Sequence, residues 1–560
     1  MTLRQEINEL IQYRNAYFLA FSATAGYVCF GWDIGLIGGV IALPSFQQYF
    51  GLDKESPSAR AALSGNIVSV LQAGGLSESF GAIASSWLAS RFGRKPSLLA
   101  SAVIFLIGSV IQSIVGIGSG AAVGLKVLYF SRFFGGVGVG LMAAVVPTYV
   151  SECAPRAIRG RCTGSIEVAV GLGNMLSFWV NYGASINIRA GEMQWRTPII
   201  VQLIPGVIFF ILMLFQPESP RWLVERGRYD DAAKSLAHIA RKDPSDDAVQ
   251  LTLNEIRADF VGKHRLSILD QFKRMGENRI IALRCIIPSL ATFFQQWSGT
   301  NAINYYSPII FAGLGMSSTT ATLLATGIYG VIKFVATCLV LAFVIESWGR
   351  KKTLFYGGIS QGLMMIWIGG YSGVHPQPTV VPATYVSIIA VYLYGVCFSL
   401  GWGFTPLVLG SEVSPGHLRP AVMSLASGMT WLFTYVIAQI TPIMLERITY
   451  GTYLVFGVAS IIMALWVYIF IPETTGYPLE DVRFLFEKDI IVRSLQDAPG
   501  GRVFLGKRCA VSVEELKRLA NAPVGVGHSV PAKDMQSDEE SSDEKEVTRD
   551  SQIVDDPLII

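Results

Sequence analysis

The sequence predicts an all-α membrane protein with twelve transmembrane helices in two pseudo-symmetric halves of six. Three observations support this prediction. Charged residues make up 15% of the 560 residues, against roughly 25% in soluble chains, and the mean hydropathy is +0.45. Apolar runs long enough to cross about 30 Å of hydrocarbon as helix recur along the chain. Several short motifs of the first part return in the second part at a nearly constant offset.

Twelve apolar runs define the expected spans. They are 16–41, 65–89, 97–118, 124–149, 160–182, 197–216, 281–311, 321–345, 353–372, 384–410, 420–445 and 451–471. The charged segment 217–280 separates six runs from six, and its helix-forming stretches 229–241 and 249–260 predict short cytosolic helices. We therefore expect an N-terminal half, 16–216, a helical linker and a C-terminal half, 281–471.

Lysine and arginine predict the orientation. With a cytosolic N-terminus, the outer loops hold six of them and the four short inner loops hold ten, so both ends are expected in the cytosol. We expect the plasma membrane as the location, although these charges do not distinguish it from an internal membrane. Residues 1–15 then form a cytosolic end, and 472–560 form a largely disordered, acidic cytosolic tail whose stretch 534–556 has a net charge of −8. This tail is either a site for a kinase or ubiquitin ligase or a plain solvated segment.

Composition also excludes several functions. The formal charge of +3 is spread between apolar runs without a basic stripe, so we expect no nucleic-acid partner, only a lipid bilayer and a small molecule. The seven cysteines show no metal-site spacing, and no nucleophile or cofactor constellation appears. We expect no enzyme, no metal and no cofactor, with a proton gradient as the energy source.

Three motifs recur in register. Residues 92–95 return at 348–351 (+256), 151–159 at 411–419 (+260), and 217–219 at 472–474 (+255). Such a duplicated six-helix unit is typical of carriers, which hold their substrate between the halves.

A few ionisable residues lie inside the expected spans, where each requires a partner or a task. Asp33 and Arg132 fall at the same depth, roughly 6 Å from the midplane, so they are expected to pair. The pair either exchanges a proton when it separates or only holds two helices together. Lys333 and Glu167 either neutralise each other or leave the lysine to meet an anionic substrate. Glu78 has no partner that the sequence identifies.

The seventh expected span is rich in amides and aromatics. Gln295, Gln296 and Asn301, followed by Tyr305 and Tyr306, form a surface of donors and acceptors suited to a ligand with many hydroxyl groups. The alternative is that these polar groups only join neighbouring helices.

A set of charged residues repeats at the inner membrane level. Its members are Arg94, Glu152, Arg159, Glu218, Arg350, Glu412, Arg419 and Glu473. Glu152 lies seven residues before Arg159, and the repeat has the same spacing, so the two residues of each pair can share a helix face. Opposite charges from both halves can close this surface in one state and release it in the other. Alternatively, the charges only set the orientation.

Together the motifs resemble the sugar porters of the major facilitator superfamily, over about residues 16–482. The motifs that carry the resemblance are Asp33 with its glycines, Arg132-x-x-x-Gly136-x-Gly138-x-Gly140, Pro147-x-Tyr149-x-Ser151-Glu152, Pro217-Glu218-Ser219-Pro220-Arg221, Gln295-Gln296-x-Ser298-Gly299-x-Asn301 and Pro472-Glu473-Thr474. Residues 178–183 and 327–333 further resemble a fungal branch that includes quinate permeases and hexose, pentose and sugar-acid carriers.

The resemblance implies alternating access and a set of residue roles. Asp33 and Arg132 would form the proton-coupling pair, the amides of the seventh span would bind substrate, Tyr305 and Tyr306 would lie at the outer gate, and Trp431 would line the site. Glu167 stands where the family has a sugar-binding glutamine. We therefore expect proton-coupled uptake of a monosaccharide, a hexose or pentose, by alternating access. The alternatives are a symporter of quinate or a sugar acid, a passive uniporter, and a nutrient sensor that does not transport.

Overall fold

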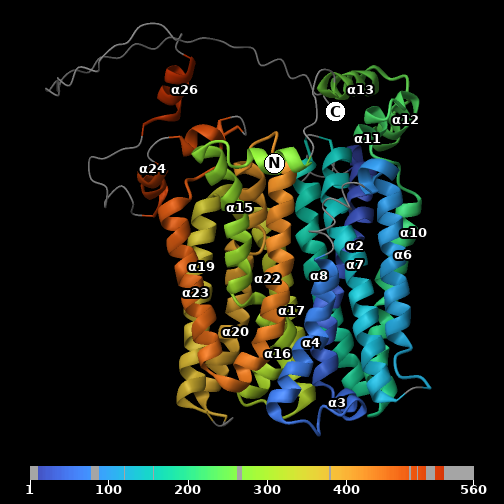
Figure 1. Cartoon of the computed structure of the whole chain (residues 1–560), viewed down its shortest axis with the longest axis vertical. Helices are drawn as coiled ribbons and strands as arrows, with labels where there is room; N and C mark the ends of the chain where they lie inside the picture. The colour runs from blue at the N-terminus through green and yellow to red at the C-terminus, as the bar shows by residue number, and fades with distance from the viewer. Residues whose placement is uncertain are drawn as a thin grey trace, which may run out of the picture.

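The computed structural model describes residues 11–76, 88–118, 120–155, 157–260, 268–376, 380–478, 481–487, 490–499 and 511–521. Within these ranges the regular structure consists of helices, and most of the long ones run along the long axis of the molecule (Figure 1). This confirms the predicted all-α membrane fold.

The first group of helices contains two that pack unusually closely. The group comprises α2 (Arg14–Ala42), α3 (Pro44–Phe50), α4 (Pro57–Gly75), α6 (Arg94–Ser113), α7 (Ala121–Cys153), α8 (Arg159–Asn187), α9 (Glu192–Val201) and α10 (Leu203–Leu214). A Cβ atom on Gly31 of α2 would lie 2.0 Å from the carbonyl oxygen of Val170, and one on Gly173 of α8 would lie 2.1 Å from that of Val28. Only glycine permits this approach, which packs α8 against the part of α2 that contains Asp33.

The second group contains two broken spans. It comprises α15 (Arg279–Trp297), α16 (Thr300–Gly313), α17 (Thr319–Leu339), η1 (Val340–Val344), α18 (Ile345–Trp348), α19 (Arg350–Val374), α20 (Pro382–Gly401), α21 (Thr405–Val413), α22 (Arg419–Arg447) and α23 (Gly451–Phe470). The continuous spans expected at 281–311 and 384–410 are therefore each two helices, as is the span expected at 197–216 in the first group, which is α9 and α10. The first break lies at Gly299, whose φ of 90° is a left-handed conformation that favours glycine.

Short helices gather at one end of the molecule. After α10 come α11 (Pro220–Glu225), α12 (Tyr229–Ala240), α13 (Asp247–Phe260) and α14 (Ile268–Arg274), and after α23 come η2 (Val482–Phe486), α24 (Ile490–Asp497) and α26 (Val513–Asn521). We call this the linker end, at the top of Figure 1, and the opposite end the α3 end. The helices expected at 229–241 and 249–260 are confirmed by α12 and α13.

The segment after 472 differs from the expectation of disorder. Phe484, Leu485 and Phe486 of η2 are buried, and with Leu516 of α26 they belong to the apolar core of the second group. These four side chains supply the burial that offsets the ordering of the segment. The acidic stretch 534–556 lies outside the described residues.

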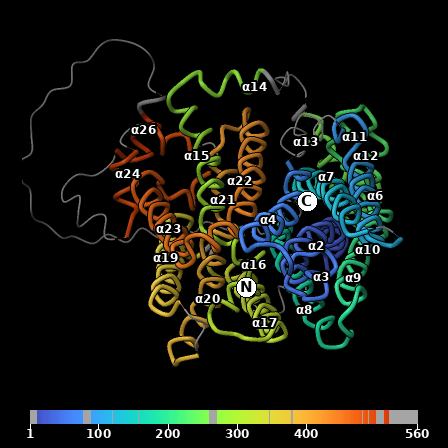
Figure 2. The backbone as a smooth tube through the Cα atoms, turned by 60° about the horizontal axis from the view of Figure 1, so that its bottom comes forward, coloured from blue at the N-terminus to red at the C-terminus, as the bar shows by residue number. Residues whose placement is uncertain are grey.

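Nine helices or broken helix pairs in the described part of the chain are long and apolar enough to cross a membrane. The helices α8 and α19, of 29 and 25 residues, have the length to cross but contain more polar residues. Of the span expected at 65–89, α4 covers the residues as far as Gly75, and residues 77–87 lie outside the described ranges. Figure 2 separates the two groups of helices, which meet where α4 packs against α22, α8 against α17 and α2 against α16.

Candidate functional site

A buried ion pair lies inside the first group of helices. Arg132 Nη1 of α7 donates to Asp33 Oδ1 of α2 at 3.2 Å, and the two side chains are 0% and 3% exposed. Arg132 Nε donates to the carbonyl oxygen of Ile67 in α4 at 2.8 Å. The helices α4 and α7 can approach this closely because residue 136 is a glycine, on which a Cβ would lie 2.1 Å from the carbonyl oxygen of Leu71. Arg132 Nη2 is buried and has no hydrogen-bond partner among the described residues. The predicted pair is therefore formed, and one of its donors is open.

Amides and hydroxyls join the two groups of helices toward the α3 end. Ser69 Oγ donates to Gln439 Oε1 at 2.6 Å, and Gln439 Nε2 donates to Asn66 Oδ1 at 2.7 Å. Gln72 hydrogen-bonds the hydroxyl of Tyr305 at 2.7 Å. We call these five residues the inter-half seam. Sequence reasoning singled out only the tyrosine, although polar residues within apolar runs were a signal for the other four.

The two tyrosines after the amides have different partners. Tyr305 reaches the first group, and the α2 helix approaches it so closely that a Cβ on Gly38 would lie 2.0 Å from its carbonyl oxygen. The hydroxyl of Tyr306 instead donates to the carbonyl oxygen of Ala438 at 2.6 Å, within the second group. The hydroxyls of the two tyrosines therefore serve different contacts, the first between the halves and the second within one half. The gate role of both stays a prediction.

The predicted amides lie together at the breaks in the second group. Gln295 Nε2 donates to the carbonyl oxygen of Trp402 at 2.7 Å, which satisfies a backbone group freed between α20 and α21. Gln296 Oε1 accepts from Asn301 Nδ2 at 2.6 Å and from Thr434 Oγ1 at 2.9 Å. The cluster thus combines groups that hold broken helices in place with acceptors and donors of the type that a hydroxylated ligand needs.

Trp431 of α22 lies between the halves. It is 4% exposed, and its ring centroid is 5.3 Å from that of Phe30 in α2. A Cβ on Gly75 of α4 would lie 2.3 Å from the indole ring. The glycine therefore makes room for an aromatic wall that both halves share.

Lys333 of α17 donates its hydrogen bonds to neutral groups. Its Nζ donates to Asn304 Oδ1 at 3.0 Å and to Thr300 Oγ1 at 3.5 Å, and it lies 5.0 Å from the ring centroid of Phe398. Glu167 of α8 is near enough to attract it, but the two residues make no ion pair within 4.0 Å. The expectation that they neutralise each other is not met by a direct contact.

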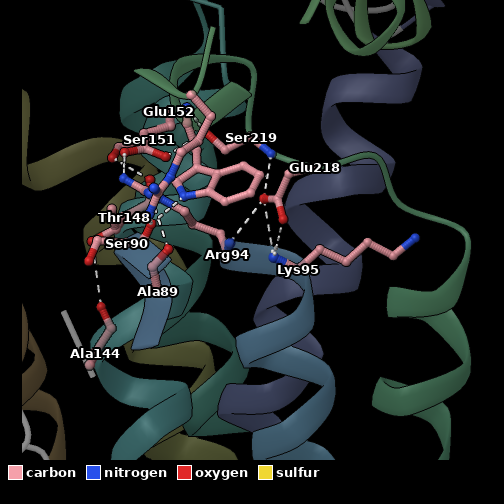
Figure 3. A network of polar contacts seen from close by, with 12 residues as sticks. Ala89, Ser90, Arg94, Lys95, Ala144, Thr148, Ser151, Glu152, Glu218 and Ser219 are labelled. Carbon is pink, nitrogen blue, oxygen red and sulfur yellow. Dashed lines mark hydrogen bonds and ion pairs between the residues drawn. The ribbon is translucent and has the colours of Figure 1, made fainter. Parts of the chain in front are cut away.

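Charged groups form a cluster at the linker end of the first group (Figure 3). Arg94 Nη2 pairs with Glu152 Oε1 at 2.8 Å, and Ser219 Oγ donates to Glu152 Oε2 at 2.5 Å. Glu218 accepts from the backbone N–H groups of Arg94 at 3.0 Å and of Lys95 at 3.2 Å. Burial raises the pKa of the Glu218 carboxyl above its ordinary value, and these N–H donors oppose the rise.

The second group repeats these contacts. Arg350 Nη2 pairs with Glu412 Oε1 at 2.8 Å, Thr474 Oγ1 donates to Glu412 Oε2 at 2.6 Å, and Glu473 accepts from the backbone N–H of Arg350 at 2.9 Å. The duplication seen in the sequence is therefore a duplication of contacts. Each of the two ion pairs joins residues of the same half, where the sequence suggested charges that meet across the halves.

The helix face expected to be shared by each glutamate and the arginine seven residues later is not formed. Glu152 is on α7 and Arg159 begins α8, and likewise Glu412 is on α21 and Arg419 begins α22, so neither pair shares a helix face. A proline in each connecting turn ends the preceding helix. Arg159 donates to a backbone carbonyl at 3.4 Å, and Arg419 Nε is buried without a hydrogen-bond partner in the described ranges. Glu78 lies outside the described residues.

Comparison with known proteins gives three kinds of relative. A family model described as "Sugar (and other) transporter" matches residues 19–486. A probable quinate permease of Neosartorya fischeri is 35% identical over 491 residues, which cover 85% of this chain and 88% of the relative. A quinate permease of Neurospora terricola is 34% identical and covers 84% and 88%.

Solved structures give the same result. The xylose transporter XylE from E. coli, in a partially occluded inward open conformation, matches with a TM-score of 0.69 and 26% identity, over 83% of this chain and 100% of that one. A structure of the proton:xylose symporter XylE bound to 6-bromo-6-deoxy-D-glucose matches with a TM-score of 0.68 and 26% identity, over 85% and 100%.

Proposed function

Because this chain belongs to the sugar (and other) transporter family of integral, multi-pass membrane proteins, we propose that it takes up a monosaccharide together with protons. The observation that carries the proposal is the buried pair of Asp33 and Arg132. A carboxylate at this depth is costly to leave charged and unpaired, so it can bind a proton when the arginine moves away. The Nη2 group of Arg132 has no hydrogen-bond partner among the described residues, so it can donate to another acceptor during that movement.

The substrate is a hexose or pentose that binds between the halves. Gln295, Gln296 and Asn301 would bind its hydroxyl groups, and Trp431 would pack against its ring. Alternating access then requires the inter-half seam to open at the α3 end and close again. The two charge clusters would serve the cytosolic gate by fixing the helix ends within each half, so that the halves 16–216 and 281–471 move as units about the linker.

A second candidate is a symporter of quinate or a sugar acid. It is favoured by Lys333, whose hydrogen bonds go to neutral groups and which has no carboxylate of the described residues within ion-pair distance, so that a carboxylate substrate could pair with it directly. The relatives named as quinate permeases also favour it. A passive uniporter and a non-transporting sensor are the remaining alternatives, and the presence of a buried Asp33 argues against the uniporter.

The test is an uptake panel in a transport-null host at several pH values. The panel contains glucose, xylose, galactose, quinate and galacturonate. Uptake of a hexose or pentose that acidifies the cell supports the proposal. Uptake restricted to the two acids favours the second candidate. Absence of uptake for every compound, with protein present at the cell surface, would turn the assignment toward a sensor.

In the proposed orientation the protein spans the plasma membrane, and the linker end and both termini lie in the cytosol. A reporter fused after Ile560 and a tag inserted near Val380 should then lie on opposite sides of the membrane. Protease protection in sealed cells measures this. Finding both on the same side would contradict the orientation without affecting the choice of substrate.

A further inference from the structure

A cavity of about 480 Å³ opens at the linker end of the first group. It lies between the start of α6, the end of α10 and the helices α11 and α12. Its lining contains three cationic side chains, Lys95, Arg228 and Lys234, and two carboxylates, Glu218 and Asp231. The cavity is separate from the proposed transport site, which lies within the spans.

Both carboxylates already have hydrogen-bond or ion-pair partners within the protein. Glu218 accepts from backbone N–H groups at the start of α6. Asp231 pairs with Arg228 at 2.8 Å and lies 3.7 Å from Lys234. Lys95 Nζ donates to the carbonyl oxygen of Leu214, the last residue of α10, at 2.8 Å, and its other two protons have no acceptor in the part of the chain that the structure describes. Positive charge therefore remains available in the cavity, and Lys95 points away from the Arg94–Glu152 pair (Figure 3).

The equivalent lysine of the second half is buried and surrounded by oxygen acceptors of the chain. Lys351 lies 256 positions after Lys95 and likewise donates to carbonyl oxygens at the end of its last span, those of Val467 at 3.1 Å and Tyr468 at 3.0 Å. It also donates to Ser494 Oγ of α24 at 2.6 Å and is fully buried. The chain itself thus supplies the additional oxygen in one half, while the equivalent place in the other half is open.

We propose that this cavity binds the phosphate group of an anionic lipid from the adjacent leaflet. The phosphodiester of a lipid has two oxygens that share a negative charge, which match the free protons of Lys95 and the nearby Lys234. The lipid is favoured over a soluble phosphate because the cavity also contains Phe215 and Phe92, which are 70% and 53% exposed. These rings lie where the spans end and can contact acyl chains. Basic groups at a cytosolic membrane surface are attracted to anionic lipids.

The experiment uses the full-length protein purified in detergent and measures its melting temperature with three probes. The probes are phosphatidylinositol, phosphatidylcholine and inorganic phosphate. Wild-type protein should be stabilised by phosphatidylinositol and not by phosphatidylcholine. Replacing Lys95 and Lys234 together by Gln should weaken the apparent affinity for phosphatidylinositol by about five-fold for each lysine.

Two further variants make the result specific. Lys95→Arg keeps the charge and should retain binding, which separates lost recognition from misfolding. Lys352→Gln removes an exposed lysine at the same level of the other half and should bind as wild type does. Equal stabilisation of the wild type and the double Gln variant would overturn the proposal. Stabilisation by inorganic phosphate alone would support phosphate recognition and overturn the lipid as its source.

Discussion

The substitution Asp33→Asn tests the proposed coupling directly. The carboxyl is 3% exposed and pairs with Arg132 at 3.2 Å, so it has no solvent to stabilise its charge when the pair separates. Asn has nearly the same shape but cannot bind or release a proton. We expect the variant to fold, because the remaining guanidinium keeps its bond to the carbonyl oxygen of Ile67 at 2.8 Å.

The magnitude follows from the energy of the proton gradient. One proton that crosses about 100 mV carries about 2.3 kcal/mol, which supports roughly a forty-fold accumulation of a co-transported solute. The Asp33→Asn variant should accumulate substrate only to the outside concentration, and its uptake should not depend on external pH. Exchange of labelled for unlabelled substrate should continue, since it needs no net proton movement.

The assay compares uphill uptake with counterflow in the same vesicles. Asp53→Asn is the matched control, since it removes an exposed carboxyl from the same half at the α3 end. It should behave as wild type does. Arg132→Ala should be more harmful than Asp33→Asn, because a buried carboxylate that loses its partner costs about 3 to 5 kcal/mol. An Asp33→Asn protein that still concentrates its substrate would refute the reasoning and move the proton site elsewhere.

Three further predictions follow from the contacts of the second half and of α2. Asn301→Ala removes the donor to Gln296 and should raise the apparent Km for the sugar about five-fold to a hundred-fold at unchanged surface expression, whereas an unchanged Km would exclude this amide from the site. Lys333→Gln should abolish uptake of quinate or galacturonate and spare that of glucose, and equal loss of both would indicate a structural role. Gly38→Ala places a Cβ 2.0 Å from the Tyr305 carbonyl oxygen, so it should push the halves apart at the α3 end and increase labelling of cysteines introduced there. Unchanged labelling would contradict that role.

The sequence was sufficient to predict the fold and to predict which residues belong to most of the clusters. Depth along two spans predicted the contact between Asp33 and Arg132, because 1.5 Å per residue places them at one level. The repeat of three motifs predicted the paired charge clusters. These inferences hold because the bounds of an apolar run and the rise per residue of a helix give the depth of a residue from its position in the sequence alone.

The partners within a cluster could not be predicted in the same way. Arg94 lies 58 residues before its partner Glu152, and Tyr305 lies 233 residues after Gln72. Which face of a helix meets which neighbour depends on packing, and packing here depends on glycine contacts that a single sequence does not reveal. The broken spans were missed for a related reason, since glycine is frequent in membrane helices and Gly299 alone did not indicate a break.

The positions of the ion pairs and of the inter-half seam indicate which contacts must break when the carrier changes its conformation. Because the Arg94–Glu152 and Arg350–Glu412 pairs lie within single halves, separating the halves at the linker end leaves both pairs intact. Opening the α3 end instead breaks the three hydrogen bonds of the inter-half seam. At about 1 kcal/mol for each net bond, the cost is about 3 kcal/mol. A substrate shifts the equilibrium between the two states only by the difference of its binding free energy for them. A difference of about 3 kcal/mol, which is within the roughly 4 kcal/mol of millimolar binding, would offset this cost.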